Sequence, residues 1–233
     1  MGRLLGMVGT PPLGARQMLM DFYGLAEAGH LQGWGMSGFN NGRAVYFGRS
    51  SAAVQSNPAS YETAVQKCEK SNSPIMMAHF RRDPGDACDI TQVHPFHHRD
   101  YVFAHDGPIE RPGDLAIVDT VPQGQNASER LLHWLVERMI PADDATTALI
   151  EAIQELKEKM EVPALTFLLT DGQRLWAYRE SKDKSATLFW TEENGKRVIC
   201  SEPLAPVARW KDIPQKKLFV FDPAQVAPQL LTV

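Results

Sequence analysis

Apolar residues are spaced differently in successive parts of the chain, and each spacing predicts an element. Residues 4–8 form a short apolar run that is typical of a buried strand. From Ala15 to Ala28 the apolar positions recur at helical spacing, which predicts an amphipathic helix. Two strands are predicted next, Trp34 to Phe39 and Arg43 to Arg49, because the Asn-Asn-Gly between them favours a tight hairpin turn.

The rest of the chain holds its helices and strands in groups. The pattern predicts, in order, a helix at 61–70, strands at 75–80 and 101–105, helices at 128–140 and 143–160, and strands at 165–170, 175–179, 187–191, 197–200 and 218–221. Residues 82–100, rich in Asp, Pro, Gly and His, are expected to form a long loop, and loops of that length are usually functional. Grouped elements predict an α+β layered fold rather than parallel βαβ units. No linker divides the chain, so we expect a single domain over residues 1–233.

Composition and charge exclude several classes of function. The 233 residues are 43% hydrophobic and 22% charged, which is enough to bury a full core. A net charge of −4 with scattered Lys and Arg argues against a nucleic-acid partner. The three cysteines are widely spaced and odd in number, which favours free thiols in a reducing compartment. No apolar run approaches the roughly 18 residues that a membrane span needs, so we expect a cytoplasmic protein without a membrane partner.

Seven short segments carry a resemblance to a known family. They are Met-Gly-Arg-Leu-Leu-Gly at 1–6, His-Leu-Gln-Gly-Trp-Gly at 30–35, Ala-His-Phe-Arg at 78–81, His-Pro-Phe at 94–96, Ala-His-Asp-Gly at 104–107, Asn-Ala-Ser-Glu at 126–129 and Ser-Glu-Pro-Leu at 201–204. In this order they resemble the class II (N-terminal-nucleophile) glutamine amidotransferases, especially the small stand-alone bacterial members. The resemblance implies a four-layer αββα sandwich, with two antiparallel sheets packed between helical layers.

The resemblance places the family's catalytic nucleophile at Gly2. In the family this residue is a cysteine that becomes the first residue once Met is removed, and its thiolate attacks the side-chain amide of glutamine. Its own α-amine serves as the base, which is reasonable because the pKa of a free α-amine is about 8. Gly2 has no side chain, so the nucleophile of this reaction is missing.

Two further positions depart from the family's pattern. Asp106 stands where the family has the asparagine that, with Gly107, donates hydrogen bonds to the oxyanion. Removing one such donor costs roughly 10²–10³ in rate, and a carboxylate about 4 Å from the oxyanion would add roughly 4 kcal/mol of repulsion at an effective dielectric of about 20. Ala127 stands where the family has the aspartate that binds the α-ammonium group of the substrate. Three departures in separate segments favour natural loss of the site over one engineered change.

Other positions of the family's substrate pocket are kept. Arg81 occupies the position that binds the substrate α-carboxylate, and the alternative is an arginine in a structural ion pair. Trp34, Gly35, His105 and Ser128 are expected beside the pocket, with core packing as the alternative for Trp34 and His105.

Two other kinds of chemistry are alternatives to this interpretation. The residues Cys88, Asp89, His94, His97 and His98 fit no standard zinc spacing, so no metal and no other cofactor is expected. Cys200, next to the Ser-Glu-Pro-Leu segment, is either a displaced nucleophile or a buried strand residue.

The sequence therefore predicts a catalytically inactive amidotransferase-like protein. It would bind a small carboxylate-bearing molecule, or serve as a regulatory or partner subunit of an active or ammonia-using enzyme. The alternative is an active glutamine-dependent amidotransferase or amidohydrolase whose native cysteine was changed to Gly2. A third hypothesis is a new hydrolase that uses Cys200 or a metal.

Overall fold

The computed structural model describes residues 2–29, 31–82, 89–183, 185–207, 209–225 and 227–233. Its helices are α1 (Arg16–Gly29), α2 (Pro58–Glu69), α3 (Ala127–Met139) and α4 (Ala145–Lys159), with short 3-10 turns at Val54–Ser56, Ile90–Gln92 and Pro112–Asp114. Its strands are β1 (Arg3–Val8), β2 (Trp34–Asn40), β3 (Arg43–Ser50), β4 (Ile75–Phe80), β5 (Phe96–His98), β6 (Tyr101–Asp106), β7 (Ala164–Thr170), β8 (Leu175–Ser181), β9 (Phe189–Glu193), β10 (Lys196–Cys200), β11 (Lys211–Asp212), β12 (Lys217–Phe221) and β13 (Gln229–Thr232).

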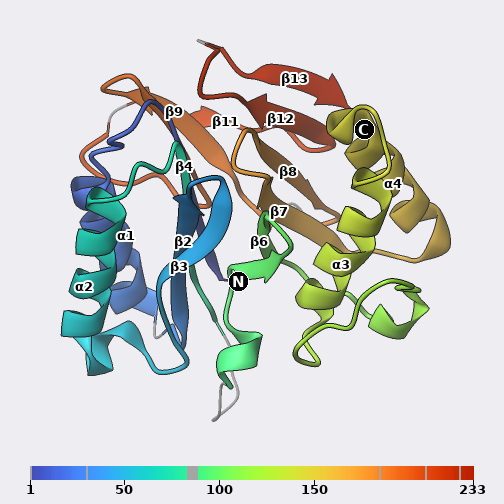
Figure 1. Ribbon diagram of the computed structural model, residues 1–233, viewed down its shortest axis with the longest axis horizontal. Helices are drawn as coiled ribbons and strands as arrows, with labels where there is room; N and C mark the ends of the chain where they lie inside the picture. Colours follow the sequence, from blue (N-terminus) through green and yellow to red (C-terminus); the bar gives the residue numbers. More distant parts are fainter. Residues whose placement is uncertain (1, 30, 83–88, 184, 208, 226) are drawn as a thin grey trace.

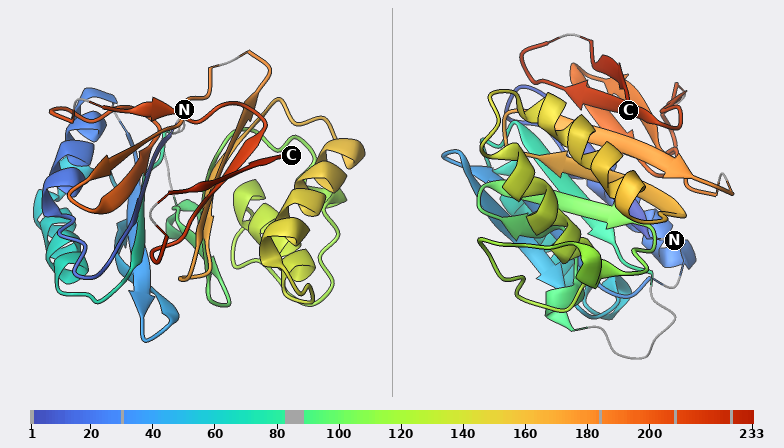
Figure 2. Two further views of the ribbon diagram at one scale, coloured as in Figure 1. Left: turned by 90° about the horizontal axis from the view of Figure 1, so that it is seen from above. Right: turned by 90° about the vertical axis from the view of Figure 1, so that its right-hand side faces the viewer.

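These strands form two antiparallel sheets. Within the described residues the first sheet has the order β11-β9-β10-β1-β4-β2-β3 and the second the order β13-β12-β8-β7-β6-β5. Helices α1 and α2 cover the outer face of the first sheet, and α3 and α4 cover that of the second (Figures 1 and 2). The expected αββα sandwich is confirmed, and the start of β1 lies in the middle of the first sheet, between β4 and β10.

Apolar side chains fill all three spaces between the four layers. One cluster joins α1 and α2 to the first sheet, a second joins α3 and α4 to the other, and a third lies between the sheets and includes Leu4, Ile75 and Leu168. Strands are therefore covered on both faces, and all six residues of β4 are buried. This explains why the strands have continuous apolar runs in place of an alternating pattern.

The hairpin predicted at Asn-Asn-Gly is confirmed. Strands β2 and β3 pair directly across it. Asn41 and Gly42 both have positive φ angles, +50° and +77°, as a tight turn between twisted strands requires. The pattern of turn residues was therefore sufficient to locate this connection.

Other parts of the prediction were wrong in detail. The expected loop at 82–100 contains the short strand β5, although residues 83–88 lie outside the described part. Strand β9 begins two residues later than expected, and β11 and β13 were not predicted. These short edge strands are defined by backbone pairing with β9 and β12 rather than by an apolar pattern of their own. Of the helices in the described ranges, none is long and apolar enough to cross a membrane.

Candidate active site

The start of β1 meets the end of β6 between the two sheets. The backbone nitrogen of Gly2 donates a hydrogen bond to Oδ1 of Asp106 at 3.1 Å. Gly2 precedes the central strand of the first sheet, and Asp106 is the last residue of β6 in the second. The fold thus brings together two positions that lie 104 residues apart in the sequence. These are the positions where the resemblance expects the nucleophile and an oxyanion donor.

Neighbouring groups already fill the space beside Gly2. A Cβ atom at this position would lie 2.8 Å from Nε2 of His79 and 2.9 Å from the carbonyl oxygen of Phe80. Real Cβ atoms essentially never make contacts this short, so any side chain at position 2 requires its neighbours to shift. His79 can move because it is a side-chain end, whereas the Phe80 carbonyl belongs to the backbone of β4.

The electrostatics of Asp106 differ from those of an amide at the same place. Burial raises the pKa of its carboxyl group, and the Gly2 N–H bond and the charge of Arg3 oppose that rise. Arg3 itself forms an ion pair with Glu202, with Nη2 and Oε1 2.5 Å apart, and donates to the Gly2 carbonyl at 3.2 Å. When ionised, the Asp106 carboxylate only accepts hydrogen bonds, so it offers no donor to an oxyanion.

Gly107 is held in a conformation that only glycine adopts readily. Its φ is +142°, and an added Cβ would lie 2.3 Å from the carbonyl oxygen of Ala164. Any larger residue would therefore be strained and would clash with the start of β7.

Three buried histidines lie beside Gly2 and Asp106. His79, His94 and His105 are each less than a tenth exposed. Burial is the main cause that lowers the pKa of His79 to about 3 and that of His105 to about 4, and it lowers the pKa of His94 well below its ordinary value. The rings of His79 and His94 have centroids 4.5 Å apart, and Nδ1 of His105 lies 2.9 Å from Oγ of Ser128. Burial therefore favours the neutral form of all three imidazole rings.

The other predicted pocket residues occupy several places. Trp34 is 2% exposed and packs edge-on against Tyr61, and its role beside the pocket stays a prediction. Gly35 allows close approach of the His94 carbonyl, which would lie 2.2 Å from an added Cβ. Ala127 begins α3 and packs against the apolar cluster of that half.

Arg81 lies near the buried histidines. Its backbone pairs with Gly33 at 2.9 Å, and its charge contributes to the lowered pKa values of His79 and His94. Its expected role in binding a carboxylate stays a prediction.

A pocket of about 200 Å³ opens next to Gly2 and Asp106. The described residues that line it are Gly2, Arg3, Leu4, Arg82, Asp106, Thr166, Ser185, Thr187, Ser201 and Glu202. The wall therefore contains Gly2 and Asp106 but none of the six residues expected to bind substrate, which are Arg81, Trp34, Gly35, His105, Ala127 and Ser128. Thr166 was not predicted from the sequence. It reaches the pocket because it pairs with Asp106 between β6 and β7, and this pairing is not visible in the sequence.

Comparison with known proteins agrees with this geometry. The family profile described as class-II glutamine amidotransferases matches residues 1–190. The chain belongs to this family. Among its relatives is the candidate glutamine amidotransferase YafJ of Escherichia coli (strain K12), which is 24% identical over 195 residues, covering 76% of this chain and 72% of YafJ.

Solved structures share the fold of this family member. A glutamine aminotransferase class-II domain protein from Silicibacter pomeroyi aligns with a TM-score of 0.68 at 18% identity, over 99% of this chain and 98% of its own. Glutamine phosphoribosylpyrophosphate amidotransferase from B. subtilis aligns with a TM-score of 0.74 at 12% identity, over 99% of this chain and 49% of its own. This amidotransferase-family chain thus spans about half the length of the larger enzyme.

The two thiols in the described part of this family member, Cys68 and Cys200, do not have the properties of a displaced nucleophile. Cys200 is fully buried, and burial raises the pKa of its thiol to about 12. A nucleophilic cysteine needs the opposite shift. Cys68 is likewise buried with a raised pKa of about 12, and Cys88 lies outside the described residues.

His97 and His98, which the sequence places in a histidine-rich segment, contact different aromatic rings. The ring of His97 stacks on Tyr46, with centroids 3.7 Å apart, and the ring of His98 stacks on His133, with centroids 3.9 Å apart. Across the part of the chain that the structure describes, no three His, Cys, Asp or Glu side chains are placed to hold a metal ion.

Proposed function

We propose that this chain is a class II glutamine amidotransferase family member without glutaminase activity. The observation that carries the proposal is the 3.1 Å hydrogen bond from Gly2 to the Asp106 carboxylate. An amide hydrolysis that proceeds through a covalent intermediate needs a nucleophilic side chain, and Gly2 has none.

The electrostatics of the pocket support the same conclusion. The reaction develops negative charge on the carbonyl oxygen of the substrate amide, and hydrogen-bond donors stabilise that charge. An ionised Asp106 would repel it. Gly2 would therefore prevent the covalent step, and Asp106 would destabilise its transition state.

We propose further that the retained pocket and fold serve binding. The chain would act as a small-molecule-binding protein, or as a regulatory or partner subunit of an active or ammonia-using enzyme. The pocket of about 200 Å³ beside Asp106 supports the first role. Two nearly fully exposed apolar side chains, Val118 at 85% and Val121 at 86%, offer a surface for the second.

A glutaminase assay tests the absence of catalysis. The purified chain is incubated with glutamine, and ammonia and glutamate are measured. We expect no release above that of buffer, since the nucleophile is missing. A turnover of about 1 s⁻¹, at the lower end of ordinary enzyme rates, would overturn the proposal.

Two variants distinguish natural loss of the active site from a change at Gly2 alone. We expect Gly2→Cys to remain inactive, because Asp106 still repels the oxyanion and the new side chain must displace His79. The triple variant Gly2→Cys, Asp106→Asn, Ala127→Asp should be more active than the single one by about 10² or more. Efficient glutamine hydrolysis by Gly2→Cys alone would instead support an active enzyme whose native residue is cysteine.

A further inference from the structure

A row of polar side chains crosses the second sheet at the pocket. Asp106 on β6 pairs with Thr166 on β7, and Thr166 pairs with Arg179 on β8. Directly paired residues of antiparallel strands point to the same face of the sheet. A carboxylate, a hydroxyl and a guanidinium group therefore lie side by side on the face that carries the pocket.

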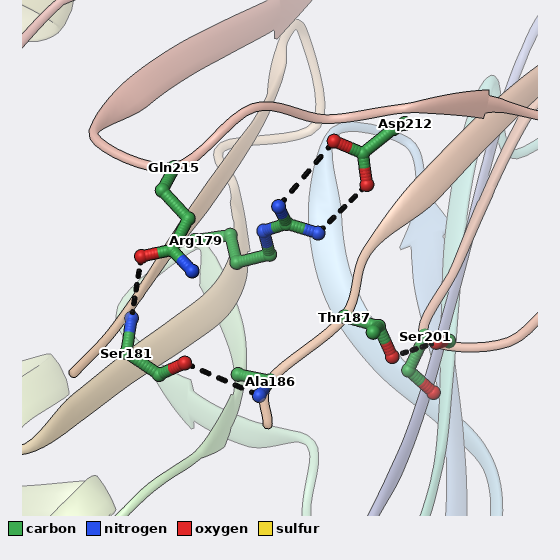
Figure 3. Close-up of polar contacts among 7 residues, drawn as sticks. All are labelled: Arg179, Ser181, Ala186, Thr187, Ser201, Asp212 and Gln215. Carbon is green, nitrogen blue, oxygen red and sulfur yellow. Dashed lines mark hydrogen bonds and ion pairs between the residues drawn. The ribbon is translucent and has the colours of Figure 1, made fainter. Parts of the chain in front are cut away.

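Hydroxyl groups also line the opposite wall. Oγ of Ser201 accepts a hydrogen bond from the Leu4 nitrogen at 3.1 Å, which leaves its hydroxyl hydrogen to donate. Thr187 donates to the Ser201 carbonyl at 2.7 Å, and this contact ties the two segments of the wall together (Figure 3).

Arg179, at one end of the row, forms an ion pair with Asp212. Nη1 and Nη2 of Arg179 contact the two carboxylate oxygens of Asp212 at 2.8 and 3.3 Å (Figure 3). This bidentate pair joins β8 of the second sheet to β11 of the first. Because Asp212 already neutralises Arg179, this guanidinium group does not balance the charge of Asp106. Arg3 in the pocket wall, whose charge acts on Asp106, is itself paired with Glu202.

At the other end of the row, a buried hydroxyl lies next to a half-buried carboxylate. Thr166 is 2% exposed, and among the described residues its hydroxyl oxygen has no hydrogen-bond partner. Asp106 receives one hydrogen bond from the described chain, from the Gly2 nitrogen. Buried polar groups are normally satisfied, so the Thr166 hydroxyl indicates a polar partner supplied from the pocket, where the half-buried Asp106 carboxylate can accept further hydrogen bonds.

We propose that this pocket binds a small primary amine that carries a hydroxyl group. Its ammonium group would pair with Asp106, and its hydroxyl would bond to Thr166 and Ser201. The volume of about 200 Å³ equals that of about seven water molecules, so the pocket has room for a small ligand of this kind. The inference rests on the proposed function, since it assigns to a non-catalytic pocket the ligand that its own side chains favour.

Calorimetric titration of the full chain tests the inference, with ethanolamine as the probe. Ethylene glycol lacks the ammonium group and acetate carries the opposite charge, so both serve as comparators. We expect ethanolamine to bind and the comparators to give no measurable heat of binding. Asp106→Asn should weaken ethanolamine binding about tenfold or more, because it removes a charge-assisted contact.

The hydroxyl contact has its own variant and matched control. Thr166→Val keeps the side-chain shape and should weaken binding about two- to tenfold. Thr191→Val makes the same change at a buried threonine whose hydroxyl donates to the Arg209 carbonyl outside the pocket, and it should bind ethanolamine like the parent. Thermal unfolding of each variant checks that it is folded.

Dependence on pH adds a second readout that needs no substitution. The affinity for ethanolamine should fall as pH is lowered and Asp106 becomes protonated. The inference is overturned if Asp106→Asn binds as well as the parent, if affinity does not change with pH, or if ethylene glycol or acetate binds equally well. Ammonia release from glutamine, measured on the same preparation, would overturn the proposed function without altering an amine titration performed in the absence of glutamine.

Discussion

Two carboxylates in the second half of the sandwich have opposite surroundings. Glu129, in the first turn of α3, is 4% exposed and accepts hydrogen bonds from the nitrogens of Gln123 and Gly124 at 2.9 and 2.8 Å. Asp106, at the end of β6, accepts one described hydrogen bond, and burial raises the pKa of its carboxyl group. Both groups lie in segments that the family resemblance singles out, at 126–129 and 104–107.

The difference separates a structural carboxylate from one that is available to a ligand. Glu129 fastens the loop before α3 to the helix, and each of its oxygens has a backbone donor. Asp106 lines a pocket and has a single described donor. A carboxylate whose two oxygens are bonded by backbone donors stabilises the fold. A carboxylate with a single donor can accept further hydrogen bonds from a ligand.

The largest expected effect is a fall in the free energy of unfolding as pH is lowered, caused by the buried histidines. The pKa of His79 is lowered from 6.5 to about 3 and that of His105 from 6.5 to about 4. Between pH 6.5 and those values the unfolded chain binds protons that the native chain does not, so stability falls as pH falls. The slope is about 1.4 kcal/mol per pH unit for each such histidine.

Asp106 should act in the opposite sense. Its folded pKa is raised, so its protonation stabilises the native chain slightly as pH falls, and two or more histidines outweigh it. Urea unfolding at pH 7, 6 and 5 measures the sum. A free energy of unfolding that stays constant over this range would show that the histidines are not held neutral.

Removing the satisfied carboxylate should have the next largest effect. Glu129→Ala leaves two backbone N–H groups without acceptors and should cost about 3 kcal/mol in the free energy of unfolding, measured with urea. Glu137→Ala is the matched control on the same helix. Glu137 is only partly buried and also accepts from backbone nitrogens, those of Val118 and Asp119, so its loss should cost about 1 kcal/mol. Equal costs for both variants would contradict the comparison.

The smallest effect is expected at the pocket carboxylate, Asp106. Asp106→Asn keeps an oxygen that can accept the Gly2 hydrogen bond and removes a buried charge, so the free energy of unfolding should change by less than about 1 kcal/mol. The same urea series measures it. A loss of about 3 kcal/mol would place Asp106 in the same structural class as Glu129.

The amino-acid sequence by itself, through its apolar spacing and the order of its motifs, determined most of the fold. Apolar spacing located helices α1 to α4 and the longer strands, because each element buries a face or a whole run of its residues. The seven family segments then indicated the αββα sandwich, together with Gly2 and Asp106 as the altered positions. None of this requires distances between separate segments, since each signal is local or depends on the order of short motifs.

Tertiary structure alone decided which side chains meet. His79 lies against Gly2 because β4 pairs with β1, and Thr166 lies beside Asp106 because β7 pairs with β6 in one particular register. Trp34 packs in the core because β2 presents it to α2 and Tyr61. A shift of one residue in either pairing would turn these side chains to the opposite face, and no local pattern in the sequence specifies that register.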